Sequence, residues 1–399
     1  PEKVLVYIKT DSTEKTSKLL AKPDIVKRFE LSDGWVSAEM PSKVRDTLAN
    51  TKGVTIENVN QFEIVAPPWC DPDSTHPACK DDDGGDDSDS TRPTPNDQTP
   101  WGIETIYGDD TITATTGGSG IKVAVLDTGI AEHLDFADEG EAKIQQCLDY
   151  TGGGVKSSCK DGNGHGTHVS GTIAANAGTD DKGIYGVASE ATLLVYKVCN
   201  NGGMCSGDAI SAAIEQAADD GANIISISLG GSSLSTSEKN ALDYATGSGV
   251  LVIAAAGNSG PDLDTIKYPA AYYKVVSVAA LQDGTQLSVP DFSSRGADAT
   301  SFEETDRLLE VSAPGRSVES TWKDGEYNTI SGTSMATPHI SGLAAKMWSS
   351  ISDSDNDGLL NDDVRDWLQN RADDYDITSG KHAGTGYDPA SGLGLPQVP

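Results

Sequence analysis

Apolar residues in the second half of the chain recur as short, nearly continuous blocks separated by helical segments. Five blocks predict strands, at Ile121–Leu126, Thr192–Val198, Asn223–Leu229, Val250–Ala256 and Lys274–Ala280. Amphipathic spacing predicts helices between them, near residues 165–176, 208–220 and 236–248. Strands that are apolar throughout and alternate with helices are typical of a parallel sheet covered on both faces. We therefore predict an α/β fold that binds its ligands beyond the carboxyl ends of the strands.

The first 66 residues carry a smaller pattern in which strand-like and helical segments alternate. Apolar positions predict strands at Val4–Lys9, Gly34–Glu39 and Thr55–Val65. Helical spacing at Glu14–Leu20 and Ser42–Asn50 places one helix in each gap. The order β-α-β-α-β predicts a small α+β domain of the ferredoxin-like kind.

A polar segment separates these two patterns. Residues 67–97 contain almost no large apolar side chain and include the aspartate-rich run Asp81–Asp89. Such a composition favours a solvated linker over packed structure. The predicted organisation is therefore a small domain at 1–66, an acidic linker at 67–97 and the α/β domain at 98–399.

The net charge narrows the choice of partners. The chain has 61 acidic and 29 basic residues among 399, a formal net charge of −32. A surface this acidic repels nucleic acid and anionic lipid, so neither is an expected partner. No apolar run approaches the ~20 residues of a membrane-spanning helix. We expect a monomer whose acidity fits a high-salt habitat, of halophilic or archaeal type, although lysines outnumber arginines and the habitat stays open.

The cysteines bear on the compartment. Six are present in three close pairs with no C-x-x-C spacing, and they lie among polar residues. We predict three local disulfides and secretion into an oxidising compartment, with six reduced thiols as the alternative. The chain begins without a signal-like apolar stretch, which fits either a cytosolic protein or a removed export signal. The predicted pairs are Cys70 with Cys79, Cys147 with Cys159, and Cys199 with Cys205.

Three segments place reactive side chains where the α/β pattern predicts chemistry. Asp127 follows the strand at 121–126, and His165 follows a glycine-rich turn at the start of a helix. Ser334 lies at the start of another helix, because Pro338 suits an early helical turn. A serine hydroxyl needs an imidazole base to attack an amide, and the imidazole needs a carboxylate that fixes its tautomer. Together these groups are the parts of an acyl-transfer site, although each alone could be a cap or turn residue.

The segments around these residues carry a resemblance to a known family. Asp127–Gly129, Asn163–Gly171 and Gly332–Pro338 resemble, almost letter for letter, the three signatures of subtilisin-like serine proteases. The resemblance covers roughly residues 97–396. It implies a mostly parallel sheet with helices on both faces and a secreted serine endopeptidase.

The resemblance also assigns roles to single residues. It implies that Asp127 orients His165, that His165 acts as general base and then acid, and that Ser334 is the nucleophile. The side-chain amide of Asn258 and the backbone N–H of Ser334 are implied as the donors that stabilise the oxyanion.

Two further segments resemble the family's substrate-binding edges, between which an extended peptide adds as a strand. The Cys199–Cys205 pair brackets one of them. The pocket for the residue before the scissile bond is implied at residues 255–257 and at Lys267, whose cation would favour an acidic or polar side chain over a large apolar one. The implied substrate-binding residues are Gly203, Met204, Ser228, Leu229, Gly230, Ala255, Gly257 and Lys267.

The small N-terminal domain resembles the family's propeptide, a folding chaperone and intramolecular inhibitor of the zymogen. Because parallel sheets have many non-local contacts and fold slowly, a template lowers the barrier. We expect its last strand to occupy the substrate cleft and self-cleavage to follow Val65. A cut elsewhere before Gln98 and a permanent N-terminal domain are the alternatives.

An acidic loop near the C-terminus predicts a calcium site. Asp353, Asp355 and Asp357 are spaced as the oxygen ligands of a calcium loop, and glycine holds the sixth position. The twelfth position is not glutamate, so Asp362 or Asp363 would complete a ligand set that includes Asn361. A solvated acidic turn is the alternative.

The family resemblance implies a second Ca²⁺ site. Its pieces would be Asp135, Asp97 or Gln98, and the loop 176–181, which contains Asp180. That loop is about two residues longer than the family pattern.

Three other readings remain. A zinc site at His165 and His168 lacks a nearby Glu, and His168, His133 and His339 are expected to be structural. A non-catalytic calcium-binding surface protein could share the fold. An esterase could share the triad.

Overall fold

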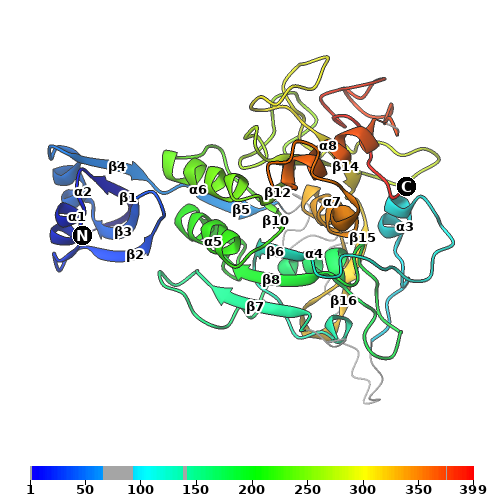
Figure 1. The fold of residues 1–399 in the computed structure, drawn as a ribbon, viewed down its shortest axis with the longest axis horizontal. Coiled ribbons are helices and arrows are strands. Elements are labelled where there is room, and N and C mark those ends of the chain that lie inside the picture. Colours follow the sequence, from blue (N-terminus) through cyan, green and yellow to red (C-terminus); the bar gives the residue numbers. More distant parts are fainter. Residues whose placement is uncertain (1, 66–92, 138–141, 374) are drawn as a thin grey trace.

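The computed structural model describes residues 2–65, 93–137, 142–373 and 375–399. Figure 1 shows two parts: a small one at the N-terminus, which we call the N-terminal unit (residues 3–58), and a large one, which we call the body (residues 93–399). A single strand, β5 (Gln61–Ile64), runs from the first into the second.

A seven-stranded sheet forms the centre of the body. Its order is β14-β13-β12-β10-β6-β8-β7, and every neighbouring pair is parallel. The strands are β6 (Lys122–Asp127), β7 (Ile144–Asp149), β8 (Thr192–Lys197), β10 (Ile224–Ile227), β12 (Leu251–Ala255), β13 (Val276–Leu281) and β14 (Val311–Pro314).

Alternate residues of these strands enter two separate cores. In β6, Val123 and Val125 belong to one buried cluster, whereas Ala124 and Leu126 belong to the other. Both faces are therefore dry, because successive side chains of a strand point to opposite faces. The first cluster includes residues of α3 (Trp101–Tyr107), α4 (His165–Ala174), α7 (Thr333–Met347) and α8 (Asn361–Ala372); the second includes residues of α5 (Gly207–Asp219) and α6 (Thr236–Gly247).

The parallel sheet with helices on both faces agrees with the prediction, and all five predicted strands belong to it. The prediction missed the two edge strands. β7 contains two adjacent glutamines and β14 has only four residues, so neither forms a long apolar block. The remaining elements of the body are β9 (Met204–Ser206), β11 (Leu229–Gly230), β15 (Val318–Thr321), β16 (Tyr327–Ile330) and short 3₁₀ turns at Leu134–Phe136, Lys323–Gly325 and Trp348–Ser350.

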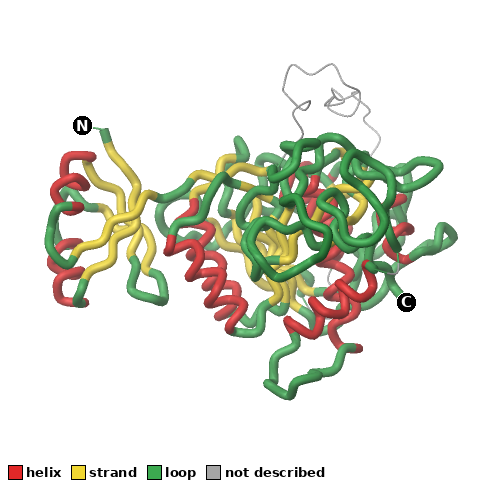
Figure 2. Tube along the Cα trace, turned by 90° about the horizontal axis from the view of Figure 1, so that it is seen from above, coloured by secondary structure: helices red, strands yellow, loops and turns green. Residues whose placement is uncertain are grey.

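The N-terminal unit is a four-stranded antiparallel sheet with two helices. Its order is β2-β3-β1-β4, and Figure 2 shows its helices on the side away from the body. Val6 and Ile8 of β1 pack under these helices, whereas Tyr7 points to the other face. The elements are β1 (Lys3–Thr10), α1 (Thr13–Leu20), β2 (Val26–Glu30), β3 (Val36–Pro41), α2 (Ser42–Ala49) and β4 (Val54–Asn58).

Two details of the predicted N-terminal order are wrong. The strand β2 was missed because it lies at an edge of the sheet and contains a lysine, an arginine and a glutamate. These charged residues interrupt the apolar pattern that would predict a strand. The predicted strand Thr55–Val65 is two strands in different sheets: β4 pairs with β1, and β5 pairs with β9 and β11 of the body. The chain leaves the first sheet between Asn58 and Gln61. Within the described ranges, no helix is long and apolar enough to cross a membrane.

Candidate active site

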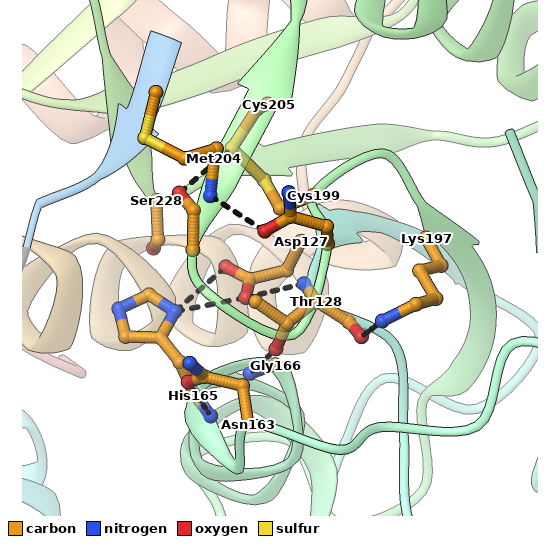
Figure 3. Close-up of a disulfide and its surroundings, with 12 residues drawn as sticks. Asp127, Thr128, Asn163, His165, Gly166, Lys197, Cys199, Met204, Cys205 and Ser228 are labelled. Carbon is orange, nitrogen blue, oxygen red and sulfur yellow. Dashed lines mark hydrogen bonds and ion pairs between the residues drawn. A yellow bond between two sulfur atoms is a disulfide. The ribbon is translucent and has the colours of Figure 1, made fainter. Parts of the chain in front are cut away.

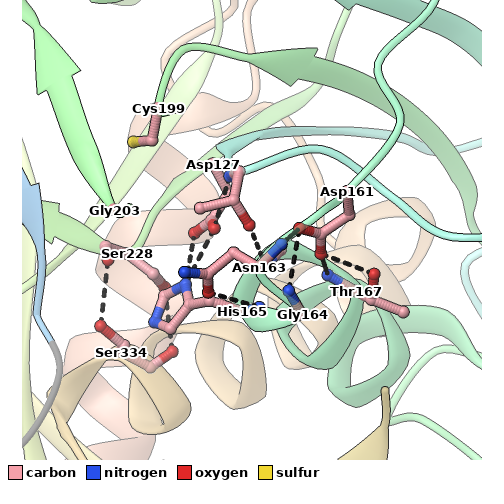
Figure 4. A network of polar contacts seen from close by, with 12 residues as sticks. Asp127, Asp161, Asn163, Gly164, His165, Thr167, Cys199, Gly203, Ser228 and Ser334 are labelled. Carbon is pink, nitrogen blue, oxygen red and sulfur yellow. Dashed lines mark hydrogen bonds and ion pairs between the residues drawn. The ribbon is translucent and has the colours of Figure 1, made fainter. Parts of the chain in front are cut away.

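Asp127 and His165 form a bonded pair at the carboxyl end of the central sheet. Asp127 ends β6 and His165 begins α4, and both side chains are buried. The two carboxylate oxygens lie 2.8 and 3.0 Å from His165 Nδ1 (Figure 4). The carboxylate also accepts the Thr128 N–H at 2.7 Å. A carboxylate in this position favours the imidazole tautomer with a proton on Nδ1, which leaves Nε2 as the base.

The glycine-rich turn that carries His165 is organised by Asp161. Its two carboxylate oxygens accept the backbone N–H groups of Asn163, Gly164 and Thr167 at 2.9 to 3.0 Å and the Thr167 hydroxyl at 2.7 Å. Burial alone would raise the pKa of Asp161, but these hydrogen bonds hold the pKa below its ordinary value. The turn therefore stays fixed by an ionised carboxylate.

Ser334 lies in the first turn of α7, beside the His165 ring (Figure 4). Its hydroxyl lies 3.1 Å from the carbonyl oxygen of Val65 and 3.0 Å from that of Ser228. His165 Nε2 is buried and has no hydrogen-bond partner among the described residues. In this state the serine hydroxyl therefore lies within hydrogen-bond distance of these two carbonyl oxygens and is not hydrogen-bonded to the imidazole.

Asn258 also contacts the Val65 carbonyl oxygen. Its side-chain Nδ2 donates to the Val65 oxygen at 2.8 Å, and its Oδ1 accepts the Thr333 N–H at 3.0 Å. Gly332 lies beside them at φ 152°, and a Cβ there would lie 2.9 Å from the Val65 oxygen. Only glycine leaves the space that this carbonyl occupies. Asn258 and the Ser334 hydroxyl both contact the Val65 oxygen, whereas the Ser334 N–H is not hydrogen-bonded to it.

The strand β5 lies between two edges of the body. On one side it pairs antiparallel with β11, and on the other with β9. Ile64 N donates to Gly203 O at 3.0 Å, and Val65 N to Ser228 O at 3.4 Å. Met204 lies opposite Glu63, and Leu229 lies opposite Ile64. The chain's own residues thus occupy the cleft as an added strand.

Comparison with known proteins identifies the family. Residues 118–394 match the Subtilase family. The chain belongs to the subtilase family. It is 40% identical over 401 residues to the subtilisin of Bacillus sp. (strain TA39), covering 97% of this chain and 90% of that protein. The predicted family, the fold class and the serine peptidase class are thereby confirmed.

Solved structures agree with this assignment. Sphericase is 48% identical, with a TM-score of 0.71, covering 76% of this chain and 99% of the sphericase chain. Fervidolysin from Fervidobacterium pennivorans, described as a keratinolytic enzyme related to subtilisin, is 26% identical with a TM-score of 0.72. That match covers 99% of this subtilase and 60% of fervidolysin.

Lys267 and Val65 both lie against Gly230 of β11. A Cβ at Gly257 would lie 2.6 Å from Lys267 Cγ, and one at Gly230 would lie 2.9 Å from Lys267 Cβ and 3.4 Å from Val65 Cγ2. Ala255, at the end of β12, is fully buried behind this wall. The alkyl stem of the lysine therefore fills the space that two wall glycines leave open. Lys267 also lines an adjoining pocket of about 300 Å³ together with Glu63 and Met204.

Two of the three predicted disulfides are present. Cys147 is bonded to Cys159, and Cys199 to Cys205. Figure 3 shows the second of these above the Asp127–His165 pair. The predicted Cys70–Cys79 pair lies outside the described residues.

Two other histidines near the site are buried and neutral. Burial lowers the pKa of His168 to about 3 and that of His339 to about 4. His168 Nε2 lies 3.0 Å from the Val318 carbonyl oxygen, and His339 Nδ1 lies 2.8 Å from that of Met335. No His-containing metal cluster is found among the described residues, and these contacts are structural.

The predicted calcium ligands fall into one gathered set and one dispersed set. Carboxylate oxygens of Asp353, Asp355 and Asp357 lie within 4.8 Å of one another, the only such acidic cluster within the described ranges. Asp363 Oδ1 accepts the Ser354 N–H at 3.0 Å, while Asp363 Oδ2 and Asn361 Oδ1 are buried atoms without a hydrogen bond.

The second predicted set of calcium ligands consists of Gln98, Asp135 and Asp180. The Asp135 carboxylate is fully buried and accepts the Ile184 N–H at 2.8 Å and the Tyr327 hydroxyl at 2.9 Å. The Gln98 amide donates to the carbonyl oxygens of Asp181 and Gly183. Asp180 is exposed. The structure therefore does not gather these carboxylates into one cluster.

Sequence reasoning missed the contacts that dock the N-terminal unit on α5 and α6. Glu215 accepts the N–H and hydroxyl of Ser32, each at 2.9 Å. Glu238, the capping-box residue of α6, accepts Asn60 Nδ2 at 2.6 Å. Burial raises the pKa of Glu215 and of Glu238, and hydrogen bonds only partly offset it. The sequence did contain a signal for these contacts, because Glu215 and Glu238 are acidic residues within helices that were predicted from apolar spacing.

Proposed function

We propose that this subtilase is a secreted endopeptidase made as a zymogen, with Asp127, His165 and Ser334 as its triad. The observation that carries the proposal is the position of the Val65 carbonyl, which Ser334 and Asn258 both contact. A carbonyl placed at a nucleophile and at an amide donor has the arrangement that acyl transfer requires.

The reaction follows from these positions. Ser334 Oγ attacks the carbonyl carbon while His165 Nε2 takes the hydroxyl proton, and Asn258 stabilises the oxyanion. The tetrahedral intermediate collapses to an acyl-enzyme as His165 returns the proton to the leaving amine. Water then attacks the ester with His165 again as base, releasing the carboxylic acid and restoring Ser334. The hydroxyl must first turn from the Val65 carbonyl toward Nε2.

Residues 1–66, which include the N-terminal unit and β5, are proposed as propeptide and inhibitor, with residues 67–97 as the linker. The strand β5 occupies both edges on which another peptide would bind, and the contacts on α5 and α6 hold it there. Sphericase leaves about a quarter of this chain unmatched, a share close to the size of residues 1–97. We propose cleavage between Val65 and Ala66, with the linker as the alternative position.

The pocket beside Val65 is proposed to exclude large apolar side chains. Lys267 narrows it with its stem and brings a cation to the region. A panel of peptide amides that differ only at this residue tests the idea. We expect Val or Glu to be cleaved faster than Phe or Leu, and Lys267→Gly to reverse the order. A wild-type preference for Phe or Leu would contradict it.

Calcium is proposed as a stabilising ion at residues 353–363. The three gathered carboxylates, with the unpartnered oxygens of Asn361 and Asp363, fit the oxygen-only preference of Ca²⁺. We expect a chelator to lower the melting temperature of the wild type by more than that of Asp355→Asn/Asp357→Asn. Equal chelator effects on both proteins would contradict this site. The site at Gln98, Asp135 and Asp180 stays a family-based proposal.

Secretion is proposed because two disulfides are present in an acidic protein, which fits an oxidising compartment. Monomeric state and high-salt adaptation remain predictions. Mass measurement in native conditions and activity against salt concentration would test them.

Labelling and proteolysis together test the activity. A fluorophosphonate should label the wild type and not Ser334→Ala, and casein should be cleaved only by the wild type. Absence of labelling would favour the non-catalytic calcium-binding alternative. Labelling with ester hydrolysis but no casein cleavage would favour the esterase.

A further inference from the structure

The two edges that hold β5 are attached to the body in different ways. The edge β11 follows β10 of the central sheet after one residue. The Ser228 hydroxyl donates to Ser334 O at 2.9 Å, and Gly231 and Tyr268 exchange two backbone hydrogen bonds of 2.8 and 3.0 Å. This wall is therefore part of the core.

The edge β9 has no strand partner other than β5 among the described elements, apart from a bridge between the two cysteines. It is the end of a small hairpin over residues 199–205. Asn200 organises the turn, since its Oδ1 accepts the N–H groups of Gly202 at 2.9 Å and Met204 at 3.1 Å. Asn163 and Lys197 add one hydrogen bond each at Asn201. The far end of β9 leads into α5.

The disulfide connects this hairpin to the backbone of the reacting centre. Cys199 N donates to the Asp127 carbonyl at 3.1 Å, and the adjacent Val198 N does so at 2.9 Å. Cys205 lies in the middle of β9, opposite Phe62 of β5. Both sulfur-bearing residues are buried, at 0% and 1% exposure.

Phe62 lies on the disulfide side of the strand. It is 2% exposed and belongs to the same buried cluster as the two cysteines and Leu229. It is the fourth residue before the proposed cut, counting back from Val65. The disulfide therefore joins the strand that pairs with Phe62 to the backbone next to Asp127, and the Phe62 ring also lies close to Gly231, next to β11.

We propose that the Cys199–Cys205 disulfide is a positioning element that sets how strongly this subtilase binds the fourth residue before the scissile bond. It holds β9 in place when the cleft is empty, so that an extended substrate binds a preformed edge. Substrates too short to reach Cys205 do not use it. The inference rests on the proposed function and concerns extended binding alone.

The test compares two chromogenic amides with each other. One carries Phe-Glu-Ile-Val, the sequence of residues 62–65, and the other carries only Val, whose N–H contacts Ser228 of the core wall and not the hairpin. For Cys199→Ala/Cys205→Ala we expect kcat/KM on the long amide to fall about tenfold through KM, with less than a twofold change on the short amide. A third amide carries Gly in place of Phe. On this amide, kcat/KM should be the same for the wild type and the variant. The matched control is Cys147→Ala/Cys159→Ala, for which the ratio of long to short should not change.

Three outcomes decide the matter, with active enzyme counted by fluorophosphonate labelling. An equal fall on both amides, or no fall on the long one, would overturn the positioning role and leave the proposed function intact. Absence of labelling in the wild type would overturn both. If the alanine pair does not fold, Cys199→Ala/Cys205→Val keeps more of the buried apolar volume, and the same ratio is measured on it.

Discussion

The body and the N-terminal unit bury their sheets in different ways. The body covers both faces of its sheet with its own helices. The N-terminal unit covers only one face, and on the other Tyr7, Leu31 and Trp35 pack toward Ala212 of α5. Most of the body's core is built from its own residues, with Phe29 and Phe62 added from the N-terminal side to the cluster that contains α5, whereas the second face of the unit is completed only by docking. The unit is therefore held on the body by this surface and by a shared aromatic contact between Phe29 and Tyr150, whose ring centroids lie 5.6 Å apart.

Buried carboxylates show the same difference. Glu310 is fully enclosed by the body and is bonded at 2.8 Å by two nitrogens of Arg365. Glu215 and Glu238 instead accept donors from the N-terminal side of the chain. Loss of the unit would return these two carboxylates to water, but Glu310 would stay buried.

The largest expected effect is on the stability of the body. Glu310→Gln leaves the Arg365 charge buried without its partner, so the free energy of unfolding should fall by about 3–5 kcal/mol. Urea unfolding measures it. The exposed Glu304, 3.7 Å from the same arginine, is the control, and Glu304→Gln should change stability by less than about 1 kcal/mol. Equal effects would show that burial does not distinguish the two carboxylates.

Asn258→Ala should separate chemistry from folding. We expect kcat on a peptide amide to fall by about 10²–10³, the loss measured for such a donor in subtilisin. The melting temperature should change little, because the other partners of Asn258 are confined to Thr333. A fall in kcat of less than about fivefold would contradict its role at the oxyanion.

Docking of the unit should weaken as the pH rises. The pKa of Glu238 is raised above 4.5 mainly by burial, so charging this carboxylate opposes docking. Affinity for the cleaved unit should be greatest below about pH 4.5 and should fall, by at most about 1.4 kcal/mol per pH unit, up to the raised pKa.

Glu238→Gln should flatten this dependence, as measured by the fraction of unit retained in gel filtration at each pH. The control is Glu190→Gln, whose carboxylate accepts the Gly117 N–H within the body. An unchanged pH profile in Glu238→Gln would refute the linkage.

The smallest effect is expected at Tyr7. Its hydroxyl lies 3.2 Å from Ser211 Oγ and 3.4 Å from Glu238 Oε1 across the docking surface. Tyr7→Phe should weaken docking by about 0.5–1.5 kcal/mol and leave the stability of the body unchanged. Tyr244→Phe removes a hydroxyl that bonds Asp219 within the body and should not alter docking.

Local patterns were enough to predict the body's central strands and to place Asp127, His165 and Ser334 at one site, because each lies within a continuous motif. The catalytic roles of these three residues stay a prediction. The edge strand β7 was not predictable, since Gln145 and Gln146 interrupt its apolar positions. The segment Thr55–Val65 is divided into two strands because two edges of the body, β11 and β9, pair with β5. The sequence of the segment itself does not reveal these edges. The two carbonyl oxygens that the Ser334 hydroxyl contacts likewise lie 106 and 269 positions away in the chain.

Intact mass measurement of the incubated protein tests most directly whether β5 lies in the cleft as a substrate. The wild type should convert to fragments that include a chain ending at Val65, and Ser334→Ala should remain whole under the same conditions. A wild type that stays uncut at Val65, or a Ser334→Ala protein cut there at the same rate, would contradict the account.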